Sequence, residues 1–124
     1  MITEDYVSFE VAKLLKEKGF DVPEYRLHAV YRDDGALQSI TADRIKERTF
    51  IQAPTNQMAL KWLREEHNII LNVAPNVDGD YECTGSFCCL IYKENKLVST
   101  LADEEYSYEE AAEAGLKYCL TKLI

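Results

Sequence analysis

The stretch FCCLIY, from Phe87 to Tyr92, is apolar at every position, and it constrains the fold more than any other segment. Successive side chains of an extended strand point to opposite sides. Both sides of this strand are therefore apolar, which is unusual for an antiparallel sheet with one solvated face. The sequence leaves two alternatives: helices of the same chain cover both faces, or a second copy of the chain covers one of them.

Three of the four cysteines, at positions 83, 88 and 89, fall in or beside this stretch and raise the question of a metal or redox site. Zinc needs ligands that converge on one point, whereas Cys88 and Cys89 face opposite sides of a strand. Cys83 would lie about 20 Å from Cys89 along the strand, unless a bulge at Gly85 shortens the separation. We therefore predict apolar strand residues here, with no metal site and no cofactor.

Helical periodicity covers three segments, 8–21, 54–68 and 107–124, with serine or threonine at each expected N-cap. Gly19 followed by Phe20 predicts a Schellman ending for the first helix. Ser107 and Glu110 predict a capping box at the start of the last one. Cys119 lies on the apolar face of that last helix, where a free cysteine behaves as a small hydrophobe.

Short strands joined by turns are expected between the helices. Alternation before Asp34-Gly35 predicts a two-residue hairpin that sets Tyr31 opposite Gln38. Further strands are expected at 49–52, 69–74, 81–92 and 96–101, the last two joined across Glu94-Asn95, with a charged loop at 43–48 and a turn at 76–79. The predicted order is α-β-β-(β)-α-β-β-β-α. We predict an α+β fold in a single domain, 1–124: a mainly antiparallel sheet of five or six hairpin-built strands with three helices packed on it.

The balance of charge argues against several classes of function. The chain has 14 basic and 22 acidic residues and a net charge of −8, so direct nucleic-acid binding is not expected. The glycines are too scattered for a phosphate-binding loop. The start lacks the basic and apolar regions of a secretory signal, and no apolar stretch approaches the ~20 residues of a membrane span. We expect a cytoplasmic protein.

The most distinctive polar segment is DEEYSYEEAAE, residues 103–113, with six carboxylates and no basic residue. Acidic residues suit the start of a helix, so one interpretation is purely structural. The other is a surface for docking a protein partner, since tyrosine is enriched at interfaces. The candidate docking residues are Asp103, Glu104, Glu105, Tyr106, Tyr108, Glu109 and Glu113.

Two histidines leave little material for catalysis. His28 alternates with arginines and is expected to face water, and His67 ends the second helix, where an imidazolium suits the helix dipole. An enzyme would need one of them to meet a cysteine or carboxylate in a concave pocket. We assign no catalytic residue.

Three blocks of the sequence, EDYVSFEVAKLLKEKGFD (4–21), APTNQMALKWLREEHN (53–68) and SYEEAAEAGLKYCLTKLI (107–124), resemble a group of short uncharacterised proteins encoded by phages and prophages of gut bacteria. Leu60 and Glu66 depart from the residues expected there. No activity is known for the group, so no functional residue is carried over. The resemblance implies a small phage accessory protein acting in a bacterial cytoplasm.

These observations favour a non-catalytic accessory protein that binds a protein partner, a second copy of itself included. This hypothesis expects a sizeable exposed patch that is apolar or rich in tyrosine, and no deep polar pocket. The alternatives are an acidic inhibitor that mimics nucleic acid, which needs carboxylates spread in a phosphate-like array, and a small enzyme built around His28 or His67.

Overall fold

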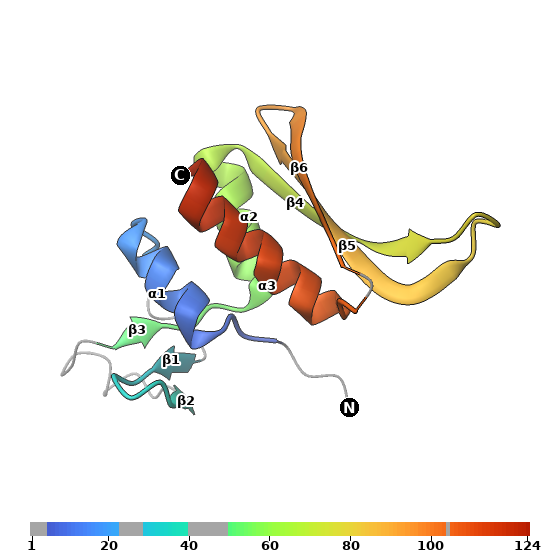
Figure 1. Ribbon diagram of the computed structural model, residues 1–124. Coiled ribbons are helices and arrows are strands. Elements are labelled where there is room, and N and C mark those ends of the chain that lie inside the picture. The colour runs from blue at the N-terminus through green and yellow to red at the C-terminus, as the bar shows by residue number, and fades with distance from the viewer. Residues whose placement is uncertain (1–4, 23–28, 40–49, 104) are drawn as a thin grey trace. The chain divides into compact units, whose positions relative to one another are not determined.

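The computed structural model describes residues 5–22, 29–39, 50–103 and 105–124 (Figure 1). The chain divides into two compact units, 1–59 and 60–124, with the boundary inside helix α2. The α+β class is confirmed. The six strands of the described residues form two three-stranded antiparallel sheets, β2-β1-β3 and β4-β5-β6, rather than the single sheet that we predicted. Each sheet pairs strands of one unit. Sequence neighbours pair in β1-β2, β4-β5 and β5-β6, whereas β3 pairs with β1 across β2 in the sequence. The single domain stays a prediction.

The first unit begins with helix α1, Phe9–Glu17, whose ends follow the predicted capping. Ser8 Oγ accepts a hydrogen bond from the Val11 amide at 3.2 Å. At the other end Gly19 has a φ of +91°, the Phe20 amide donates to the Leu15 carbonyl and the Gly19 amide donates to the Lys16 carbonyl. These two bonds form the Schellman motif expected from the sequence.

The hairpin of the first unit has a different register from the predicted one. Strands β1 (Ala29–Tyr31) and β2 (Leu37–Ser39) pair Tyr31 with Leu37, not with Gln38. The turn is the cause: Arg32 pairs with Ala36 through a 2.9 Å bond, and Gly35, with a φ of +88°, closes a three-residue loop. A β-turn followed by a left-handed glycine adds one residue to a two-residue turn and shifts every pair by one.

Strand β3, Ile51–Gln52, pairs with the other side of β1 and confirms the expected short strand. Tyr31 is buried in this unit, and its hydroxyl donates to the Val7 carbonyl at 2.6 Å. The Phe9 ring of α1 lies 5.4 Å from the Tyr31 ring. The core of the unit therefore lies between α1 and the sheet. The predicted loop at 43–48 and His28 lie outside the described residues.

Helix α2, Asn56–His67, is capped as predicted by Thr55, whose Oγ1 accepts from the Met58 amide at 3.2 Å. Ala59 and Leu63 are fully buried. The helical periodicity of 54–68 also predicts that Met58 and Trp62 are buried, but both are half-buried.

The second unit contains a meander of three strands: β4 (Ile69–Val77), β5 (Cys83–Lys93) and β6 (Lys96–Ala102). Glu94 and Asn95 both have positive φ, as a two-residue hairpin turn requires. Strand β4 is longer than the predicted 69–74, so the next turn lies at 78–82 instead of at 76–79. The Asp78 carboxylate holds that turn by accepting from the amides of Asp80 and Glu82.

Helix α3, Tyr108–Tyr118, continues as a π-helical turn, Cys119–Leu123, and packs on one face of this sheet. The predicted capping box is present: Ser107 Oγ accepts from the Glu110 amide, and the Glu110 carboxylate accepts from the Ser107 amide, both at 3.1 Å. The buried hydrophobic side chains of this sheet and helix are Ile69, Leu71, Cys89, Ile91, Ala111, Ala112, Leu116, Cys119 and Leu120. No helix among the described residues is long and apolar enough to cross a membrane.

Candidate functional site

The face of the β4-β5-β6 sheet that points away from α3 carries no charged residue. The strand register places its side chains in three rows, and we call these nine residues the outer face: Ile70, Tyr92 and Leu97; Asn72, Leu90 and Thr100; Ala74, Cys88 and Ala102. All of them are exposed or half-buried. In a chain in which 29% of residues are charged, nine uncharged neighbours on an accessible face call for an explanation.

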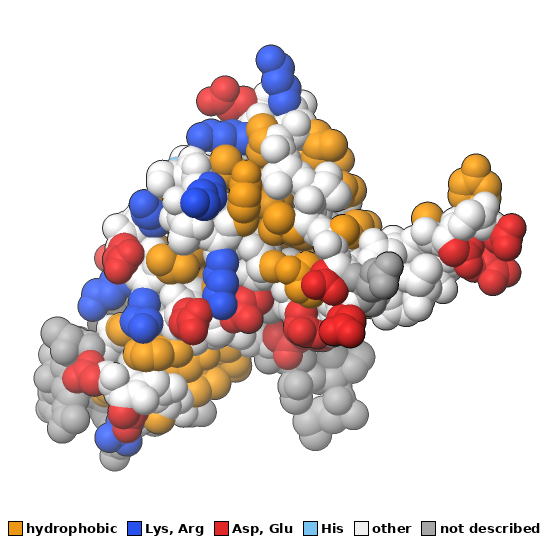
Figure 2. Space-filling view, viewed as in Figure 1, with side chains coloured by type: hydrophobic (Ala, Val, Ile, Leu, Met, Phe, Trp, Pro, Cys, Tyr) orange, Lys and Arg blue, Asp and Glu red, His pale blue; other side chains and the backbone are white. Residues whose placement is uncertain are grey.

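Helix α3 covers the opposite face of the sheet but not the outer face. Cys89 and Ile91 point toward α3 and are fully buried, whereas Ile70 is 42% exposed and Leu97 is 54% exposed. Figure 2 shows hydrophobic side chains gathered where the three strands lie. Of the two alternatives for FCCLIY, helical cover from α3 accounts for one face. The other face is open in the described part of the chain.

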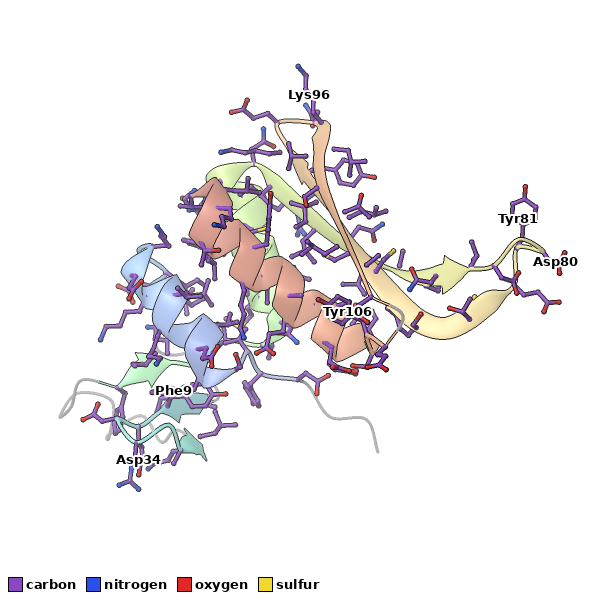
Figure 3. All side chains as sticks on the ribbon, in the orientation of Figure 1. Phe9, Asp34, Asp80, Tyr81, Lys96 and Tyr106 are labelled. Atoms are coloured by element: carbon purple, nitrogen blue, oxygen red, sulfur yellow. The ribbon has the colours of Figure 1, made fainter. Side chains whose placement is uncertain are left out.

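The hairpin between β4 and β5 extends past the end of β6 as an arm, residues 76–86 (Figure 1). Tyr81 and Asp80 are at its tip, as Figure 3 shows, and Tyr81 is 89% exposed with a φ of +62°. Asp78 and Glu82 add two further carboxylates to the tip. The arm therefore presents one aromatic ring among three acidic groups.

A polar hollow of about 510 Å³ lies where the arm joins the sheet. Ser86 Oγ accepts from Asn76 Nδ2 at 2.8 Å and lies 3.0 Å from Thr84 Oγ1. Val77, Ala102 and Asp103 also line the hollow. A second hollow of about 280 Å³, in the first unit, includes Lys16, Phe20, Asp21 and Gln52 in its lining. Among the described residues, neither lining includes a histidine or a cysteine.

The predicted docking segment gathers around the start of α3, Glu104 lying outside the described residues. Asp103 Oδ1 accepts from the Glu105 amide at 2.8 Å, and the Tyr106 carbonyl accepts from the Phe87 amide at 3.0 Å. Tyr108 is 46% exposed and its ring meets Phe87 edge-on at 5.6 Å. Asp103, Glu105 and Glu109 are exposed, whereas Tyr106 and Glu113 are half-buried. Part of this segment thus holds the helix start in place.

The cysteines do not converge. Cys83 is exposed on the arm, Cys88 is half-buried on the outer face, and Cys89 and Cys119 are buried on the side of α3. No group of three or more histidine, cysteine or acidic side chains in the described residues could hold a metal ion. Burial raises the pKa of Cys89 to about 12, with a smaller effect from the neighbouring Cys119, and burial raises the pKa of Cys119 to about 12. Both are poor nucleophiles.

His67 is half-buried at the end of α2, where its ring meets Trp62 edge-on at 4.6 Å. This contact gives the side chain a packing role. His28 lies outside the described residues.

No protein-family model, curated protein or solved structure is significantly similar to this chain. The candidate site therefore depends on the geometry of the chain alone.

The sequence did not lead us to predict two surface features, the outer face and the arm. Ile70 and Asn72 alternate with the buried Ile69 and Leu71 in β4, and this alternation was a usable signal for the outer face. The arm had no such signal, because a turn was expected at 76–79, before Tyr81. Both features depend on how far β4 and β5 pair beyond the end of β6.

Proposed function

We propose that this protein is a non-catalytic protein-binding module whose outer face on the β4-β5-β6 sheet contacts the partner. The observation that carries the proposal is the absence of charge from nine neighbouring accessible positions, with Ile70 and Leu97 about half exposed. The cores of protein interfaces are depleted in charged residues and enriched in apolar and aromatic ones. The face includes Tyr92 and Leu90 at its centre, which fits that composition.

The carboxylates of the arm and of the α3 start lie outside this face and suit a polar rim. Asp78, Asp80 and Glu82 stand at the arm tip, and Asp103 follows the end of β6. Figure 2 shows the acidic side chains of the arm grouped at its end. Rim charges steer association and favour partners of opposite sign. We expect a partner with an apolar patch bordered by basic residues.

The test is affinity capture from a bacterial lysate with three forms of the protein as bait. Ile70→Lys with Asn72→Lys places two charges on the outer face, on exposed residues of β4. Glu65→Lys, on an exposed site of α2, changes the net charge by the same amount and serves as the matched control. Circular dichroism checks that all three are folded.

We expect the wild type and the Glu65→Lys control to retain the same proteins and the outer-face variant to lose them. If the outer-face variant retains its proteins while a variant with Glu105→Lys and Glu109→Lys loses them, binding belongs to the acidic segment and the proposed surface is wrong.

The acidic nucleic-acid mimic has less support. Glu109 and Glu110 lie in the first turn of α3, but Lys117 lies in its last turn and Lys122 follows in the π-helical turn. This order of charges complements the helix dipole and does not continue a row of negative charge. The accessory role in a phage-infected bacterial cytoplasm depends on the resemblance of the three helical blocks, and it remains part of the proposal.

A further inference from the structure

The two edges of the β4-β5-β6 sheet differ in how they are protected. Among the described residues, β4 and β6 each pair with β5 alone, so both leave one side of their backbone unpaired. Exposed edges tend to pair with other strands, and proteins block them with proline, charge or bulges. β4 carries Pro75 within the strand. β6 has neither proline nor glycine, and Leu97 to Ala102 is uncharged.

One irregularity interrupts β6, and it lies near the turn. The register shifts between Ile91 and Tyr92 of β5, so Val98 is an additional residue of β6. From Ser99 to Ala102 the strand pairs regularly with β5. Every described side chain of β6 is exposed or half-buried. The C-terminal half of β6 is therefore an open and regular edge.

The charges at the two ends of β6 indicate which strand fits this edge. Lys96 begins the strand, and Asp103 follows its last residue. If β6 pairs antiparallel with the β6 of a second copy, the basic end of each strand lies beside the acidic end of the other. The twofold symmetry produces this pairing of opposite charges twice. No like charges meet between the two ends, because Leu97 to Ala102 is uncharged. A twofold interface requires this kind of self-complementarity.

We propose that the protein forms a symmetric dimer by antiparallel pairing of β6 with β6 of a second copy. Residues that lie opposite each other in a sheet share a face, so pairing about Thr100 keeps the outer-face Thr100 side chains of the two copies on the same side of the sheet. It places Thr100 opposite its symmetry mate, a favourable cross-strand pair, and Ser99 opposite Leu101. The result is a continuous six-stranded sheet. This inference does not depend on the proposed function, because it uses the unpaired backbone of β6, although Leu97, Thr100 and Ala102 of the outer face lie on the same strand.

The test is the mass in solution, measured by sedimentation equilibrium. An edge contact is smaller than a standard interface, so the concentration is raised to about 500 µM. We expect the mass to rise from the 14.2 kDa of one chain toward twice that value. Lys96→Glu places like charges together twice and should weaken the dimer about tenfold or more. The double variant Lys96→Glu with Asp103→Lys restores the attraction and should recover most of the affinity.

Lys61→Glu is the matched control, because it changes the net charge equally at an exposed position of α2 and should leave dimerisation unchanged. Circular dichroism confirms that each variant is folded. A monomer at every concentration overturns the proposal, as does a dimer whose affinity is the same in wild type and Lys96→Glu. Neither result affects the outer-face proposal, whose variants lie on β4.

Discussion

Gly115 of α3 lies against Cys89 of β5 so closely that a Cβ atom on Gly115 would stand 2.5 Å from the Cys89 Sγ atom. The same Cβ would lie 2.7 Å from Leu71 Cδ1. Glycine in a helix interior costs stability compared with alanine. Its presence here is explained by the close approach of α3 to the sheet. This approach sets the spacing between helix and sheet in the second unit.

Gly115→Ala should destabilise the protein although it improves helix propensity. Overpacking a core costs about 1–3 kcal/mol, against a gain of about 1 kcal/mol in propensity, so we expect a net loss of up to about 2 kcal/mol in the free energy of unfolding. Urea denaturation measures it. Adding Cys89→Ala removes the Sγ atom that the new Cβ would meet. The double variant should therefore lose less free energy of unfolding than the sum of the losses of the two single variants. A more stable Gly115→Ala protein would contradict the close approach.

The buried thiols predict a loss of stability at high pH. Cys89 and Cys119 have pKa values of about 12 in the folded protein, raised from 9.0 chiefly by burial. Above pH 9 the unfolded chain loses these protons first, so stability is complete below pH 9 and declines between pH 9 and pH 12. At pH 10 each thiol should lower the free energy of unfolding by about 1 kcal/mol.

The control for this pH dependence is the double variant Cys89→Ala with Cys119→Ala. It should be less stable at pH 8, because it loses packing. Its urea midpoint should fall less between pH 8 and pH 10 than that of the wild type. Equal decreases would show that other groups, such as the tyrosines, are responsible.

Replacing Tyr81 with glycine should stabilise the turn at residues 78–82. The φ of +62° at Tyr81 costs a residue with a Cβ atom about 1 kcal/mol, and its 89% exposed ring gains little from packing. The amides of Asp80 and Glu82, held by Asp78 Oδ1, should exchange with solvent about fivefold more slowly in Tyr81→Gly. Asp78→Ala should make the same two amides exchange faster than in the wild type. Faster exchange in Tyr81→Gly would mean that the ring itself holds the arm.

Tyr31→Phe should weaken the first unit. The hydroxyl of Tyr31 donates to the Val7 carbonyl at 2.6 Å in a buried setting, and removing it leaves that carbonyl without this donor. We expect a loss of about 1–2 kcal/mol by thermal or urea unfolding. Tyr108→Phe, at a 46% exposed ring, is the comparison and should change stability by less than about 0.5 kcal/mol. Equal effects of the two changes would disprove the importance of the buried bond.

Local chemistry accounts for the predictions that were confirmed. Ser8, Thr55 and Ser107 satisfy amides within three residues of themselves, and Glu94-Asn95 adopts the positive φ of its turn. Such contacts depend on neighbours in the sequence. The hairpin at Asp34-Gly35 shows the limit, because the same residues suit a two-residue or a three-residue loop and the choice shifts the register.

The sequence by itself determined three capped helices, most strands and the alternation that buries one side of β5. Only the tertiary structure decided that the strands form two sheets, that α3 covers one face of the second, and that the other face and the β6 edge are open. The physical reason is that capping and turn energies are local, whereas the cover of a face depends on the packing of segments distant in the sequence.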